Sequence, residues 1–223
     1  MVSTICWLDG ITAVGVVIFG IVVGIFSYYK SRKLEQKVLK YFGIMIVCVG
    51  LLYLGPGIDF LSIFFTGNNM DNSFGLYGIL CYMWVAPGLI FAMYLGAVLI
   101  TPKKKIFILI IYMILGIIFE IFLFIDTEGT FTFDYPAIPG EDLIKSHLNL
   151  TSPAFILIAI FLLSVLFFNG FGALYRAIQL TGELRKKFLS ISFGFIIFCL
   201  CSIFNAFLEN VLFFVVNLGM IVY

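Results

Sequence analysis

The chain has 223 residues, of which 63% are hydrophobic and 11% are charged, and its formal net charge at pH 7 is +1. A water-soluble domain of this length cannot bury so much apolar side chain, so the composition predicts an integral membrane protein that lipid solvates. The charge balance excludes a nucleic-acid binder, which needs an exposed basic face.

Apolar runs long enough to cross a bilayer recur along the whole chain. A hydrocarbon core about 30 Å thick requires roughly 20 helical residues. Short polar breaks separate runs of this length, which predicts a single all-α transmembrane domain without a soluble domain. The six complete spans are expected at residues 11–29, 41–65, 74–100, 106–125, 153–175 and 188–208, and a shorter run at 211–223 is expected to begin a seventh.

Basic residues gather in alternate loops of this bundle. The loops after the first, third and fifth spans hold Lys30, Arg32, Lys33, Lys37 and Lys40, then Lys103, Lys104 and Lys105, then Arg176, Arg185, Lys186 and Lys187. Short loops rich in Lys and Arg stay in the cytoplasm, which predicts a multi-pass protein of the cell membrane with its amino terminus outside. The long acidic loop, residues 126–151, is too short to fold alone and is expected to cap the outer mouth of the bundle.

Two ionisable side chains, Asp59 and Glu120, lie inside the expected spans. Such a group costs about 2.5 kcal/mol or more unless it is paired or hydrated. At about 1.5 Å of rise per residue, both fall in the outer third of the bundle, as do Asn205 and Glu209 of the sixth helix. These depths bring the polar groups to a common level.

Residues that share helix faces extend this polar level. Tyr112 shares a face with Glu120, and Trp84 belongs to a stripe of the third helix. The sequence therefore predicts an aromatic-lined pocket, open to the outside, that binds a small ligand or cation. Its ligand-binding residues are expected to be Glu120, Asp59, Asn205, Glu209, Trp84 and Tyr112. The alternative is that these groups only cross-link helices, or that Asp59 and Glu209 simply reach water at the interface.

Helix breakers fall near the same level. Pro56 stands between two glycines just before Asp59, and Pro87 precedes Gly88 in the third span. Both helices are expected to bend or partly unwind there, and unwound backbone at membrane depth persists only where it lines a cavity or is packed in protein. Pro56 and Pro87 are therefore the predicted hinges.

Residues for familiar membrane enzymes are missing from the sequence. His147 is the only histidine, which excludes a multi-histidine metal site and a Ser-His protease. The five cysteines lie within or at the edge of apolar stretches and contain no Cys-x-x-Cys pair. We therefore expect no enzymatic activity, no metal and no cofactor.

The stretch from Tyr175-Arg176 through Glu183 and Arg185-Lys186-Lys187 into Phe193-Gly194 resembles the basic loop before the sixth span in seven-helix sensor modules of archaea and bacteria. This resemblance implies a sensory function and a cytoplasmic signalling partner at the basic loops. Together with the predicted pocket, it makes a sensory or receptor-like module the leading hypothesis. The oligomeric state stays open.

A faint internal repeat supports a different reading. Residues 41–48 resemble residues 192–199, and each stretch follows a glutamate and a basic cluster. The resulting plan of three, one and three helices is similar to that of the SWEET-type sugar transporters, although their Pro-Gln motif is absent. The alternatives are therefore a small transporter in which Glu120 takes up and releases a proton, and a structural membrane subunit without a ligand.

Overall fold

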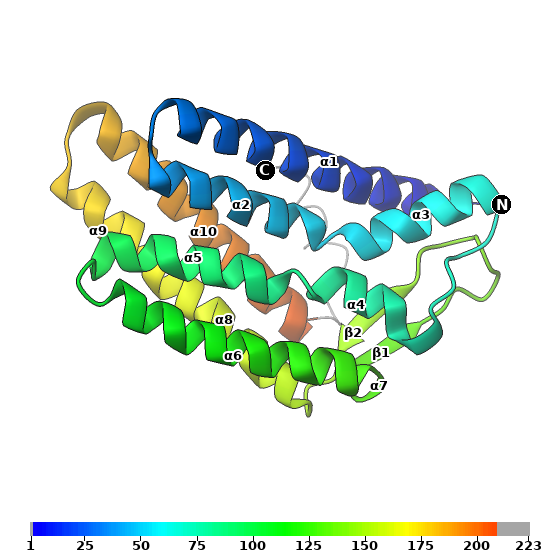
Figure 1. Cartoon of the computed structure of the whole chain (residues 1–223). Helices are drawn as coiled ribbons and strands as arrows, with labels where there is room; N and C mark the ends of the chain where they lie inside the picture. The colour runs from blue at the N-terminus through cyan, green and yellow to red at the C-terminus, as the bar shows by residue number, and fades with distance from the viewer. Residues whose placement is uncertain (1, 209–223) are drawn as a thin grey trace. The chain divides into compact units, whose positions relative to one another are not determined.

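The computed structural model describes residues 2–208 (Figure 1). Helices dominate the chain, as expected. They are α1 Thr4–Lys33, α2 Lys37–Leu51, α3 Leu54–Thr66, α4 Leu76–Tyr82, α5 Val85–Ile100, α6 Lys105–Ile125, the single turn α7 Thr127–Thr130, α8 Pro153–Val165, α9 Gly172–Gln179 and α10 Gly182–Leu208. The strands are β1 Phe131–Asp134 and β2 Lys145–Leu148. A 3₁₀ turn, Ser73–Gly75, precedes α4, and a π-helical segment, Leu166–Phe171, joins α8 to α9.

Several of these helices are long and apolar enough to cross a membrane. Five qualify in the described part of the chain, at Thr4–Lys33, Ser73–Ile100, Lys105–Ile125, Pro153–Gln179 and Gly182–Phe204. The bent pair Lys37–Leu51 and Leu54–Thr66 makes a sixth if it is counted as one span. The helical architecture with several candidate membrane spans is therefore confirmed, whereas the expected seventh span at 211–223 lies outside the described residues. The amino terminus outside stays a prediction.

The first helix is longer than expected. It begins at Thr4 rather than at residue 11, because the Oγ of Ser3 accepts a hydrogen bond from the backbone N–H of Cys6 at 2.9 Å and caps the helix. At its other end the helix continues through the basic residues to Lys33 rather than stopping at residue 29. Basic side chains suit this end, where the helix dipole is negative.

The described chain forms two compact units. Unit 1 comprises residues 2–91 and 110–155, and unit 2 comprises residues 92–109 and 156–208. Helices α5, α6 and α8 contribute to both.

In unit 1, glycines let α1 and α2 pack with their backbones in contact. A Cβ atom placed on Gly20 would lie 2.8 Å from the Cα of Gly50, and one on Gly24 would lie 2.7 Å from the carbonyl oxygen of Gly43. Lipid tails are as apolar as the side chains, so close van der Waals packing between small residues is what holds such helices together. The opposite face of α1 exposes large apolar side chains such as Phe19 and Phe26.

Both expected helix breaks occur, and each lies just before its proline. Helix α3 follows α2 after Leu52 and Tyr53 with a bend of 48°, and Pro56 is its third residue. Helix α5 follows α4 after two residues in the same way, and Pro87 is its third residue. A proline lacks the N–H and its ring clashes with the carbonyl four residues earlier, so the break falls ahead of it. Movement about either break stays a prediction.

The long loop after α6 has more structure than expected. It contains α7 and an antiparallel hairpin in which Phe131 pairs with Leu148 and Asp134 with Lys145 (Figure 1). The rings of Phe131 and Tyr82 lie 4.8 Å apart, which packs the hairpin on α4. The bundle is all-α as expected apart from this small sheet, which the loop forms because it can bury aromatic side chains against the helices.

The glycine contact between α1 and α2 can be tested with one added methyl group. The Gly20→Ala variant should lower the free energy of unfolding by about 1–3 kcal/mol, because the methyl group would overlap the backbone of α2. Gly15→Ala is the matched control, since a Cβ on Gly15 meets nothing within 4 Å. Thermal unfolding of the detergent-solubilised variants measures both, and equal stabilities would contradict the contact.

Candidate functional site

Asp59 is fully buried in α3, and three N–H groups surround its carboxylate. The backbone N–H groups of Met70 and Ile144 donate to it at 2.7 and 2.8 Å. The side-chain Nδ2 of Asn69 donates to its two oxygens at 3.1 and 3.3 Å. Both oxygens therefore have partners, and hydrogen bonds to an ionised group are among the strongest in proteins.

Asn69 extends this network to the segment before β2. Its Nδ2 also donates to the carbonyl of Asp142 at 2.9 Å, and its Oδ1 accepts from the backbone N–H of Gly140 at 2.8 Å. A Cβ atom on Gly140, which has a φ of +78°, would overlap the carbonyl of Gly67. Asp59 and Asn69 thus fasten α3, the loop that follows it and residues 140–144 together. We call this arrangement the Asp59 clasp.

The clasp gives Asp59 a structural role, which matches the cross-linking alternative. Its oxygens are occupied by donors from the protein itself, so they offer no open acceptor to a ligand. Sequence reasoning missed Asn69 and the backbone donors. The turn-forming run Gly67-Asn68-Asn69 was the signal available for them. A ligand-binding role for Asp59 stays a prediction.

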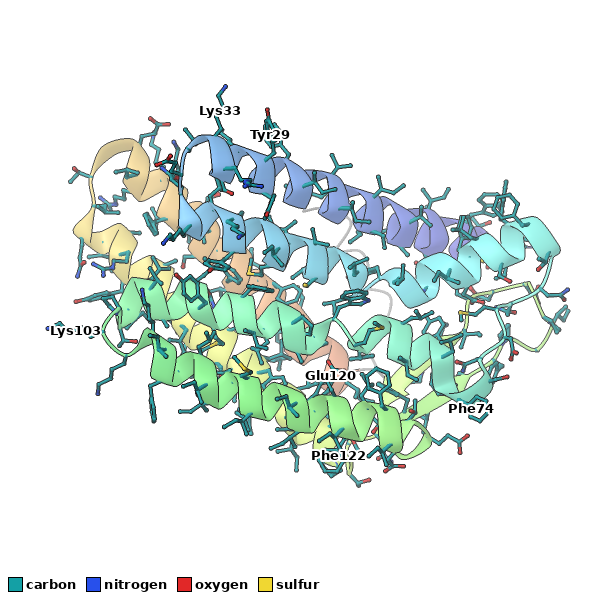
Figure 2. All side chains as sticks on the ribbon, viewed as in Figure 1. Tyr29, Lys33, Phe74, Lys103, Glu120 and Phe122 are labelled. Atoms are coloured by element: carbon teal, nitrogen blue, oxygen red, sulfur yellow. The ribbon has the colours of Figure 1, made fainter. Side chains whose placement is uncertain are left out.

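Glu120 lies in a different environment on α6. Its helix buries Gly116, Phe119 and Leu123 along one side. A Cβ on Gly116 would lie 3.3 Å from the Cβ of Ala86, so this side packs against the start of α5. Glu120 lies one turn beyond Gly116, and Figure 2 shows its side chain at the edge of α6 that faces the α4–α5 segment in that view.

Two side-chain atoms in this part of unit 1 are buried without a hydrogen-bond partner among the described residues. They are Oε1 of Glu120 and Nε1 of Trp84. Trp84 is the second of the two residues that separate α4 from α5, and its carbonyl accepts from the N–H of Gly88 at 3.0 Å. Leaving a buried polar atom unpaired costs about 1–3 kcal/mol, and more for a charged group.

The chemistry of these two groups is complementary. A carboxylate oxygen accepts hydrogen bonds and attracts cations, whereas an indole N–H only donates. Tyr112 lies two turns before Glu120 on α6 and is half-buried. An acidic group and aromatic rings of this kind would suit a small cation or a ligand with both donors and acceptors.

The remaining expected site residues divide between the two units. Asn205 belongs to α10 in unit 2, and Glu209 lies outside the described residues. Asp59 is held in the clasp of unit 1, and the two breaks before Pro56 and Pro87 also lie in that unit. The structure thus groups Trp84, Tyr112 and Glu120 on adjoining helices of unit 1, and a pocket shared by all six residues stays a prediction.

Sequence reasoning also missed a polar position in unit 2. Asn169 is 1% exposed and lies in the π-helical segment, and its Nδ2 has no partner in residues 2–208. Nearby, the hydroxyl of Ser192 donates to the carbonyl of Gly170 at 2.8 Å. Short π-helical segments are frequent at functional sites. The pair Asn169-Gly170 inside an apolar run was the available signal.

The clasp predicts a clear stability effect. Asp59→Asn should lower the free energy of unfolding by about 3 kcal/mol, because the amide keeps the shape but replaces one acceptor oxygen with an NH2 donor that faces buried N–H donors. Asn69→Ala should cause a similar loss. Asp71→Asn is the matched control in the same loop, since Asp71 is exposed and, among the described residues, bonds only Ser73. Thermal unfolding provides the measurement, and a stable Asp59→Asn variant would remove the structural role.

Comparison with known proteins adds no relative. No protein-family model, no curated protein and no solved structure matches the chain. The apolar helices themselves show a membrane protein, because hydrophobic side chains such as Phe19, Phe107 and Ile125 stay exposed on them and require lipid contact.

Proposed function

We propose that this protein is a seven-helix sensory or receptor-like membrane module that binds a small cationic ligand beside the break between α4 and α5. The observation that carries the proposal is the pair of buried, unpartnered atoms, Oε1 of Glu120 and Nε1 of Trp84, in the described part of unit 1. A ligand that supplies the missing partners removes the cost of burying them.

Contrast with Asp59 supports this choice of site. Both carboxylates belong to apolar helices of unit 1, but the protein surrounds Asp59 with its own donors and leaves Glu120 without one among residues 2–208. A group whose only purpose is to join helices needs a partner on another helix. Glu120 is therefore the better candidate for a group that meets a ligand.

The expected signal is a change in helix packing at the break. Trp84 precedes α5 directly, so a ligand that engages its indole favours one arrangement of α4 and α5 over another. A Cβ on Gly88 would lie 3.2 Å from the Cβ of Cys48. The start of α5 therefore lies against the part of α2 that directly precedes the break between α2 and α3. A shift there passes along α2 toward its basic end, where we place a cytoplasmic signalling partner.

A small transporter is the second candidate, and Asn169 favours it. Its buried amide has no partner within the described residues. It therefore adds to Glu120 of unit 1 a second polar position, which lies in an apolar helical stretch of unit 2. Unusual helical geometry with polar groups is typical of solute sites in transporters. In this reading Glu120 takes up and releases a proton during transport.

Small organic cations test the sensory proposal. Choline, tetramethylammonium and guanidinium are added to the detergent-solubilised protein, and thermal unfolding is followed. A bound cation should raise the Tm by several degrees when its free concentration is about 100 times its Kd. The Glu120→Gln and Trp84→Phe variants should lose this shift. Glu128→Gln is the matched control, because Glu128 is exposed on the neighbouring turn α7 and should keep the shift.

The same variants separate the alternatives. Without ligand, Glu120→Gln should unfold at the same Tm as the unmodified protein or higher, because it removes a buried charge that has no partner in the described chain. A loss of stability as large as that of Asp59→Asn would instead make Glu120 a helix cross-link and favour a structural subunit. Proton or solute flux into liposomes that Glu120→Gln abolishes would favour the transporter.

A further inference from the structure

One end of unit 2 carries nearly all of its charge, and that charge is positive. Among its described residues the basic side chains are Lys103, Lys104, Lys105, Arg176, Arg185, Lys186 and Lys187, whereas the single acidic one is Glu183. The carboxylate of Glu183 already pairs with the Nζ of Lys187 at 3.0 Å. An excess of cations therefore remains, which we call the basic end.

Helix termini converge at the basic end. The Nε of Arg176, near the end of α9, donates to the carbonyl of Leu99 near the end of α5 at 2.7 Å. Helix α6 follows α5 after residues 101–104, and α10 follows α9 after Leu180 and Thr181. The starts of α6 and α10 thus lie at the same end as Arg176. A helix start presents unpaired N–H groups and a positive dipole, which attract anions.

Thr101 adds a specific donor to this general attraction. It stands before Pro102, where a threonine would normally cap a helix, but α6 begins only at Lys105. The backbone N–H of Lys104 bonds the carbonyl of Thr101 at 3.0 Å, while the buried Oγ1 of Thr101 has no partner among residues 2–208. The hydroxyl is therefore left to donate to something else.

The cations beside Thr101 are partly fixed in place. The Nζ of Lys105 lies 6.0 Å from the ring centroid of Tyr94, within reach of a cation–π contact. Arg176 also donates from Nη1 to Gln179 at 3.2 Å, so its bonds to Leu99 and Gln179 use two of the five N–H donors of its guanidinium. Lys103 instead projects from the loop into open space (Figure 2).

Apolar side chains continue directly from the basic end. Ile106 and Phe107 on the first turn of α6 are 65% and 66% exposed, and Ile178 on α9 is 72% exposed. A soluble phosphate ester would gain nothing from these side chains, whereas the acyl chains of a lipid cover them. The combination of anion donors with exposed apolar neighbours is suited to a lipid headgroup.

We propose that the basic end of unit 2 binds the phosphate group of an anionic phospholipid, with the hydroxyl of Thr101, the lysines 103–105 and Arg176 as its donors. The lipid fastens the α5–α6 loop to α9, because its phosphate contacts residues on both sides of the Arg176–Leu99 hydrogen bond. This site is independent of Glu120 and makes the protein sensitive to the lipid composition of the membrane.

Delipidated protein in neutral detergent tests the proposal. Short-chain phosphatidylglycerol and phosphatidylcholine are titrated while the Tm is measured, and native mass spectrometry counts the retained lipid. Phosphatidylglycerol should stabilise the protein more strongly. The Lys103→Gln/Lys104→Gln/Lys105→Gln variant should lose at least tenfold in apparent affinity, and Thr101→Val should lose several-fold. Lys30→Gln/Arg32→Gln/Lys33→Gln, the matched control at the exposed basic end of α1, should stay within twofold.

Several results would overturn the site. An equal loss in both triple variants would show unspecific attraction between surface charge and lipid. An unchanged affinity in Thr101→Val would show that the hydroxyl is not one of the phosphate donors. Because Thr101→Val changes no charge, it keeps the test valid if a triple variant fails to fold. Stabilisation by glycerol phosphate at the same concentration would identify a soluble phosphate instead of a lipid. Equal effects of the two lipids would show that the anionic headgroup is not recognised and would overturn the site.

Discussion

Hydrocarbon offers no hydrogen bonds, so every backbone N–H and C=O that crosses the membrane needs a partner within the protein. Continuous helices such as α1 and α6 meet this demand by themselves. At the break after α2 the N–H groups of Leu52 and Tyr53 bond carbonyls three residues earlier, and the N–H of Gly57 resumes the regular pattern at 3.0 Å. The bend before Pro56 therefore leaves few backbone groups without a hydrogen-bond partner. The chemistry of the bundle then depends on its side chains.

Three polar side chains show how differently the fold treats such groups. Asp59 receives donors from two loops and becomes the point where those loops are fastened. Glu120 and Asn169 each keep a buried atom that the described chain does not satisfy. Burial alone therefore does not tell these side chains apart, whereas the presence or lack of protein donors does.

The sequence predicted the features that depend on local composition. Apolar length located the spans, and Pro56 and Pro87 located the breaks, because the effect of proline is confined to the preceding turn. The sequence did not predict the features that depend on contacts between distant residues. Ile144 donates to Asp59 from 85 positions away, and no pattern near Asp59 indicates that partner. The hairpin was not predicted for the same reason, since its strands become stable only when their aromatic side chains pack on the surface of α4.

The clasp also determines which part of unit 1 can move in the proposed mechanism. Asp59 and Asn69 hold α3 against two loops, and a Cβ on Gly55 would lie 2.8 Å from the carbonyl of Tyr77, so α3 is fixed on α4 as well. A change of the bend between α2 and α3 then moves α2 rather than α3. Helix α1 packs on both sides of this break, because Gly20 touches Gly50 of α2 and the ring of Trp7 lies 5.4 Å from that of Phe60 in α3. In the proposed mechanism a change of the bend therefore slides α2 along α1 and alters the α1–α2 loop, where the lysines and arginines of unit 1 are concentrated.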